Sequence, residues 1–151
     1  MRQLKRHRFE IKLRGLAVAR AYRSHGSMIH FQLRDLHLET FGQRTYQWGE
    51  YTLTIEIAAW NIRLPNKWLA TNNSRRPEID QTLPLFIGKR VRIARLSYPT
   101  STIEFTSGLT LELGPDTRLY GDWWPARNWC LSHRHKEAIE FKYRSHDLIA
   151  E

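Results

Sequence analysis

Short segments in which apolar and polar residues alternate recur along the chain, and this pattern limits the fold more than any other feature of the sequence. The clearest is 51–57, YTLTIEI, in which four apolar residues fall on one face of an extended strand and two threonines and a glutamate on the other. Such alternation is typical of a strand with one face in a core and the other in water. It predicts further strands at 9–13, 28–33, 36–38, 60–62, 91–96, 103–105, 109–113, 129–131 and 138–143.

The sequence shows no long amphipathic helix, so we expect an all-β fold, mainly antiparallel, with little helix. The chain has 151 residues, of which 41% are hydrophobic and 12% aromatic. This length and apolar content suit a single globular domain, 1–151, and exclude disorder for most of the chain.

The two halves of the chain carry similar patterns in the same order, which we interpret as a duplicated unit. The halves are predicted at about 9–63 and 83–143, and each reaches a tryptophan, Trp48 or Trp123, after its matched strands. The matched positions are Gly15-x-x-Val18, Ile29-x-Phe31 and Leu36-x-Leu38 in the first half, and Gly88-x-x-Val91, Ile103-x-Phe105 and Leu109-x-Leu111 in the second.

A polar connection, 64–82, is predicted to join the halves. Pro65 and Pro77 break regular structure there, and Pro65 permits a short helical turn at 65–70. Because each half has an apolar face to bury, we expect the two to close on each other as a sandwich or small barrel.

The single cysteine, Cys130, excludes an internal disulfide framework and is expected of a protein in a reducing compartment. The basic segment 1–14 contains no apolar stretch of the length that a signal peptide or a membrane span needs. We therefore expect a cytoplasmic protein with no membrane partner.

The sequence offers no convincing catalytic or metal-binding motif. Cys130 with His133 or His135 as its base would suit a hydrolase, but Cys130 lies in an apolar run, where cysteine is usually a small buried hydrophobe. His133 and His135 share a strand face, yet they lack a third ligand and are flanked by Arg134 and Lys136. No carboxylate pair and no glycine-rich phosphate loop is evident, so we expect no enzymatic activity, cofactor or metal.

The charge balance points to a negatively charged partner. Lys and Arg number 24 against 15 Asp and Glu, which gives a formal net charge of +9. A positive surface raises the encounter rate with polyanions or acidic proteins. Because arginines are scattered along the chain, a solvated surface that merely aids solubility stays an alternative.

The tract 118–129 joins arginines to aromatic residues, the types that dominate binding hot spots. The repeat assigns Trp123 to the scaffold, which leaves its neighbours as the likelier binding positions. Basic residues among aromatic rings also suit single-stranded nucleic acid or RNA, and this is the alternative function, although no known nucleic-acid motif is present.

The second half resembles small bacterial immunity proteins, the antidotes of polymorphic or contact-dependent growth inhibition toxins. The resemblance covers about half of the chain and lies in Leu85-Phe86-Ile87-Gly88-Lys89-Arg90-Val91, Ile103-Glu104-Phe105-x-x-Gly108-Leu109-x-Leu111 and Asp122-Trp123.

The resemblance implies a non-enzymatic, cytosolic protein that docks on one toxin domain, here one with an acidic surface. It carries over no functional residue, and the basic charge departs from the acidic antidotes of many basic nuclease toxins. The residues expected to bind the partner are Arg118, Tyr120, Trp124 and Arg127, with Arg75 and Arg76 at the rim.

Overall fold

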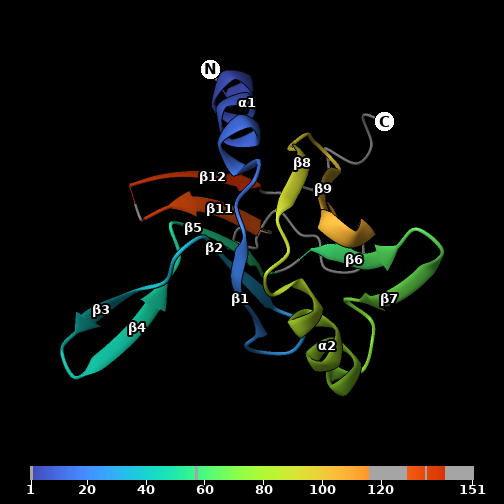
Figure 1. Cartoon of the computed structure of the whole chain (residues 1–151), viewed down its shortest axis with the longest axis horizontal. Helices are drawn as coiled ribbons and strands as arrows, with labels where there is room; N and C mark the ends of the chain where they lie inside the picture. The colour runs from blue at the N-terminus through green and yellow to red at the C-terminus, as the bar shows by residue number, and fades with distance from the viewer. Residues whose placement is uncertain (1, 57, 116–128, 135, 142–151) are drawn as a thin grey trace, which may run out of the picture.

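The computed structural model describes residues 2–56, 58–115, 129–134 and 136–141, and within these ranges strands dominate (Figure 1). They form two antiparallel five-stranded sheets and one separate hairpin, so the expected all-β, mainly antiparallel fold is confirmed. The first sheet has the order β1 (Val18–Arg23), β2 (Ile29–Leu33), β5 (Tyr51–Ile55), β11 (Trp129–His133) and β12 (Glu137–Phe141). The second has the order β7 (Lys67–Thr71), β6 (Ala59–Leu64), β10 (Thr110–Gly114), β9 (Ser101–Phe105) and β8 (Val91–Arg95).

The remaining elements connect or cover these sheets. They are the hairpin of β3 (His37–Phe41) and β4 (Arg44–Trp48), the helices α1 (Arg2–Leu13) and α2 (Arg76–Thr82), and the 3-10 turns η1 (Leu83–Phe86) and η2 (Thr106–Gly108). No helix among the described residues is long and apolar enough to cross a membrane.

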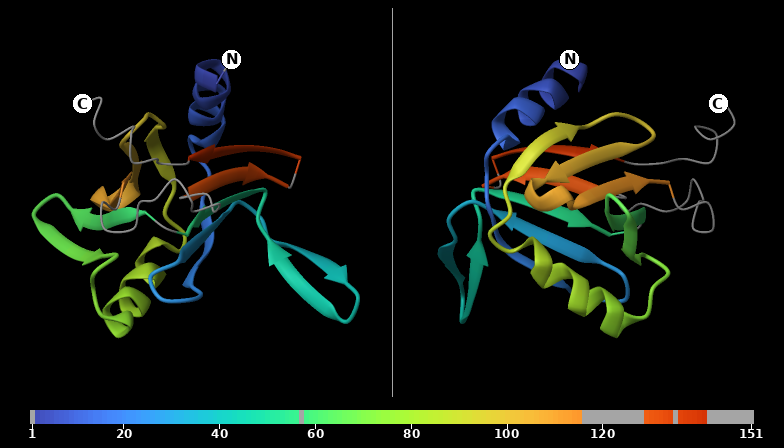
Figure 2. Two further views of the ribbon diagram at one scale, coloured as in Figure 1. Left: turned by 180° about the vertical axis from the view of Figure 1, so that it is seen from behind. Right: turned by 45° about the vertical axis from the view of Figure 1, so that its right-hand side comes forward.

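The two sheets pack against each other through a single hydrophobic core (Figure 2). Phe31 of β2 stacks on Phe105 of β9 with ring centroids 6.5 Å apart. Phe86 of η1 meets both rings edge-on, at 5.1 Å and 5.0 Å. Aromatic pairs in these geometries add to the free energy that their burial already contributes, so this triad fastens one sheet to the other.

The halves exchange their last hairpins. In each half, three strands pair with one another in the order in which they follow along the chain. These are β1, β2 and β5 in the first sheet, and β8, β9 and β10 in the second. The hairpin β6–β7 follows β5 in the chain but pairs with β10, whereas β11–β12 follows β10 but pairs with β5. Each sheet is therefore completed by strands from the other half.

The two Gly-x-x-Val segments meet at the centre of this arrangement. The Gly15 N–H donates to Val91 O, and the Gly88 N–H donates to Val18 O, each over 2.8 Å. Both glycines have φ +83, a left-handed conformation that residues with a Cβ rarely adopt. Ala17 and Arg90 form an antiparallel bridge between the segments. These reciprocal contacts fit a duplicated unit, which stays our interpretation of them.

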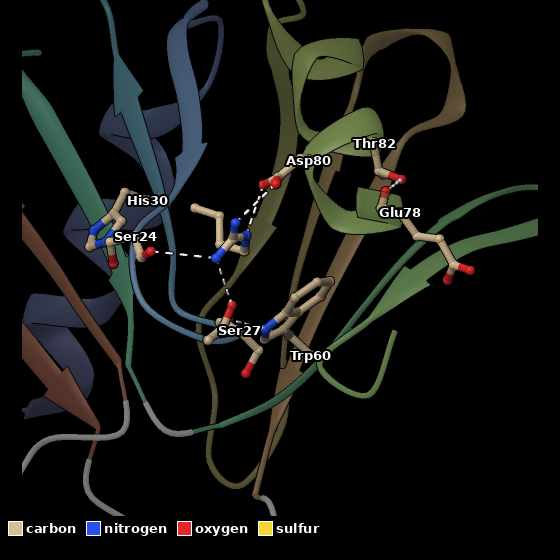
Figure 3. Close-up of polar contacts among 9 residues, drawn as sticks. Ser24, Ser27, His30, Trp60, Glu78, Asp80 and Thr82 are labelled. Carbon is tan, nitrogen blue, oxygen red and sulfur yellow. Dashed lines mark hydrogen bonds and ion pairs between the residues drawn. The ribbon is translucent and has the colours of Figure 1, made fainter. Parts of the chain in front are cut away.

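The helices are exchanged as well. Glu10 of α1 accepts a hydrogen bond from the Leu96 N–H, just past β8, at 3.1 Å. Asp80 of α2 accepts two hydrogen bonds from the Arg23 guanidinium of β1, at 2.8 Å and 3.0 Å (Figure 3). The paired guanidinium lowers the pKa of Asp80 below 3.8, mainly through the hydrogen bond.

Three details of the sequence interpretation were wrong. The segment 9–13 is helical, because Phe9 and Leu13 lie four residues apart on the buried side of α1 while Ile11 is 53% exposed. The segment 64–82 holds β7 and α2, and residues 65–70 form the turn into β7 and most of that strand instead of a helical turn.

The third error concerns the repeat. Leu38 was aligned with Leu111, but Leu38 lies in the separate hairpin, whereas Leu111 lies in the second sheet. The strand that takes the place of β10 in the first half is β5, since each pairs with the second strand of its own half. The hairpin β3–β4 is thus an insertion between β2 and β5.

Candidate functional site

The outer face of the first sheet carries two rows of polar side chains, as its register requires. Arg20, Gln32, Thr52 and Ser132 align in one row, and Tyr22, His30, Thr54 and Cys130 in the other. The β3–β4 hairpin projects from this sheet (Figures 1 and 2). At the corresponding place in the second half, η2 joins β9 directly to β10 without such a projection.

A buried polar contact holds the root of the hairpin. Gln32 is fully buried, and its Oε1 accepts hydrogen bonds from Thr52 Oγ1 at 2.7 Å and from the Gly49 N–H at 2.8 Å. Gly49 lies so close to β2 that an added Cβ would be 2.6 Å from Leu33 O. A side chain at this position would push the hairpin away from the sheet.

The hairpin presents large apolar side chains to solvent. On one of its faces, Phe41, Tyr46 and Trp48 form a ladder with ring centroids 5.9 Å and 6.1 Å apart. Leu38 lies on the opposite face. Leu38 and Phe41 are 67% and 60% exposed, and Tyr46 is 39% exposed. Large exposed apolar side chains grouped on one element are typical of an interaction site.

Two hollows open at the root of the hairpin, and Trp48 lines both. The first, of about 310 Å³, is lined by residues of β5, β11 and β12 that include Thr52, Cys130 and Ser132. The second, of about 360 Å³, lies between β1 and the hairpin and is lined by residues that include Tyr22 and Leu38. They are large enough to receive side chains of a docked partner.

His30 occupies a packed polar site on the same sheet (Figure 3). Its Nε2 is 2.7 Å from Ser24 Oγ, its Nδ1 is 3.4 Å from Thr54 Oγ1, and its ring stacks on Tyr22. Burial lowers the pKa of His30 below 6.5. A serine beside an imidazole suits nucleophilic chemistry, but Ser24 and His30 line neither of these two hollows.

Most of the residues expected to bind the partner lie outside the described part of the chain. This holds for Arg118, Tyr120, Trp124 and Arg127, and also for Trp123. Arg75 and Arg76 are described and exposed, at the beginning of α2. Arg75 pairs with Glu78 of the same helix at 3.1 Å. Partner contact at Arg75 and Arg76 stays a prediction.

Of the residues considered for catalysis or metal binding, the structure describes Cys130 and His133. Cys130 is 4% exposed, and His133 contacts Glu50 at 3.5 Å and the Tyr51 ring at 4.7 Å. His135 lies outside the described residues. Within the described ranges, no three His, Cys, Asp or Glu residues lie close enough together to hold a metal ion.

Sequence reasoning missed the hairpin as a separate element, although a signal existed. The first half needs about a dozen more residues than the second to pass from its second strand to its third, and Gly42 marks a turn within them.

Comparison with protein-family models, with curated proteins and with solved structures gave no match.

Proposed function

We propose that the protein is a non-enzymatic antidote that neutralises a bacterial toxin domain by direct docking. The projecting hairpin β3–β4 carries this proposal. It has no counterpart between β9 and β10, the corresponding place in the second half, and it exposes Leu38, Phe41 and Tyr46. A scaffold shared by two halves explains the fold, so the inserted element is where a specific contact belongs.

The chemistry of the hairpin suits a protein partner. Aromatic side chains bury a large area with few rotatable bonds, and tyrosine and tryptophan are enriched at binding hot spots. The hollows beside Trp48 offer room for side chains of the partner. Charge is nearly balanced here, since Glu39 and Arg44 lie on the same face of the hairpin. Apolar contact would thus provide affinity.

The test is neutralisation inside cells. The carboxy-terminal domain encoded by the gene immediately upstream would be expressed in a bacterial host, with and without this protein. We expect the domain to arrest growth and the protein to restore it. The double variant L38S/F41S should fail to restore growth, because truncating hot-spot side chains typically costs at least about 2 kcal/mol of binding energy each.

The matched control is W68S/L85S. Trp68 and Leu85 are 64% and 49% exposed but lie outside the hairpin, so this variant should protect as well as the wild type. An upstream gene that encodes no toxic domain, or full protection by L38S/F41S, would contradict the proposal.

A further inference from the structure

The net positive charge of the chain belongs to two segments. Residues 2–14 and 89–95 hold ten of the 24 Lys and Arg but one of the 15 acidic residues, which together give +9, the formal net charge of the whole chain. The other fourteen Lys and Arg are balanced by fourteen Asp and Glu. The arginines are scattered along the sequence, but the surplus of basic over acidic residues lies in these two segments.

The fold places these two segments side by side. At one end of the contact, the Gly15 N–H donates to Val91 O at 2.8 Å. At the other, the Leu96 N–H donates to Glu10 Oε2 at 3.1 Å. The helix α1 therefore runs along β8 in the opposite direction, as Figure 1 shows. The charges of two distant segments combine into one surface only in the folded protein.

We name this the α1–β8 basic surface, and define it by the exposed Lys12, Arg14, Arg90, Arg92 and Arg95. Arg8 of α1 is exposed too but is not counted, because it pairs with Glu137 at 3.2 Å. Arg90 Nη1 donates to Gly15 O at 2.8 Å, which leaves the rest of its guanidinium for other contacts. Within the described part of the chain, Lys12, Arg14, Arg92 and Arg95 form no ion pair. The surface thus keeps its charge instead of neutralising it internally.

The charges of α1 also oppose the stability of the helix. Its first turn contains no acidic residue, and Lys5 and Arg6 follow close behind. Cations near a helix N-terminus are unfavourable because the helix dipole is positive there, by roughly 0.3–1 kcal/mol each. Anions bound to the α1–β8 basic surface would relieve the mutual repulsion of its basic side chains.

We propose that the α1–β8 basic surface binds the phosphate backbone of a nucleic acid. Arginine side chains predominate on it, and guanidinium groups bind phosphates with two parallel hydrogen bonds. The exposed large apolar side chains of α1 are Leu4 and Ile11, and neither is aromatic. A protein interface is expected to be poor in charge at its centre and to have aromatic anchors, as the hairpin has. Contacts to phosphate need neither an uncharged centre nor aromatic anchors, and they do not depend on the base sequence of the nucleic acid.

Fluorescence anisotropy tests this with labelled oligo-dT of about 20 nucleotides and a mixed-sequence DNA duplex of about 20 base pairs, between about 50 and about 200 mM NaCl. We expect log Kd to rise linearly with log salt on both probes. The variant R92Q/R95Q should bind at least about tenfold more weakly at low salt, and its slope on the duplex should fall by about two, one for each lost phosphate contact.

The matched control is R44Q/R76Q, which removes two exposed arginines that lie outside the surface. It should change Kd less than about twofold. Equal losses in both variants would overturn the proposal in favour of diffuse charge, and so would absence of binding at low salt. Equal competition by poly-glutamate of the same charge would overturn it in favour of an acidic protein. The variant L38S/F41S should bind DNA like the wild type, which separates this proposal from the proposed function.

Discussion

Gly49 is a single residue on which the position of the projecting hairpin depends. Its backbone N–H binds the buried side chain of Gln32, and its Cα lies against the backbone of Leu33. Glycine is required here by a close approach of two backbone segments and not by a positive φ. The absent side chain is what allows the hairpin to leave the sheet at this point.

Gly49→Ala should therefore destabilise the protein. An added Cβ would be 2.6 Å and 2.8 Å from backbone atoms of Leu33, so the two strands must separate, at a cost of about 1–3 kcal/mol. Urea denaturation would measure the free energy of unfolding. Gly114→Ala is the control, because the nearest atom to its added Cβ is a side-chain oxygen of Thr100 at 3.7 Å. Equal stability of the two variants would show that the close approach at Gly49 is absent.

His30 gives a second prediction at this scale. Its pKa in the folded protein lies below 6.5 because burial penalises the charged ring, and Arg20 adds to the effect while Glu56 opposes it. The unfolded chain then binds the proton more readily than the folded chain, so stability is complete above pH 6.5 and falls as the pH drops below it.

Denaturation curves between about pH 7 and about pH 5 should show this loss in the wild type and a smaller one in His30→Gln. His25→Gln, which changes an exposed histidine in the connection between β1 and β2, should retain the full pH dependence. If His30→Gln loses as much stability on acidification as the wild type does, another group is responsible.

Between β9 and β10 the second half has the short turn η2 where the first half has the β3–β4 hairpin. This predicts that the scaffold folds without the hairpin. In the second half, Phe105 and Leu109 flank η2, and the Phe105 N–H donates to Leu109 O. In the first half, Leu33 and Tyr51 are the paired residues that flank the hairpin. Residues 34–50 would be replaced by Thr-Ser-Gly, the sequence of η2.

The shortened protein should fold with a cooperative thermal transition, because the core triad and both five-stranded sheets remain. Circular dichroism would measure the transition. The protein should also lose the ability to neutralise its toxin while it still binds DNA through the α1–β8 basic surface. A shortened chain that is unfolded would mean that the hairpin belongs to the scaffold after all.

Elements were predictable from the sequence where the local pattern was long enough. The alternation at 51–57 placed β5 correctly, and the segments 103–105 and 109–113 located β9 and β10. The segment 9–13 is too short to separate the two periods, because Phe9 and Leu13 satisfy both alternation and helical spacing. Alternation also says which face of a strand is buried but not which strand lies beside it. The exchange of hairpins and the separate position of Leu38 were therefore not accessible.

At the scale of the whole molecule, the exchange makes the halves interdependent. Without the second half, β1, β2 and β5 lack their last two strands, and α1 lacks β8. The core also spans the two halves, since Phe31 of the first contacts Phe86 and Phe105 of the second. Of the candidate partner residues, Arg118, Tyr120, Trp124 and Arg127 lie within 116–128, outside the described residues.

Fragments 1–72 and 73–151, divided at the exposed Asn73, should each be largely unfolded alone. Mixed in equal amounts, they should recover the strand signal in circular dichroism, because every exchanged contact can form between two chains. The intact protein should unfold in a single transition. A fragment that unfolds cooperatively on its own would contradict the interdependence of the halves.

The exchange of β11–β12 also affects how the chain is made. β5 lies in the middle of the first sheet, and one of its two edges pairs with β11, as in the pair of Tyr51 with His133. Translation adds roughly 5–20 residues per second, so this edge stays open for seconds while the intervening chain is synthesised. An open strand edge is a template for pairing with other chains. Newly made copies on one messenger should therefore need protection from one another until the last hairpin has emerged.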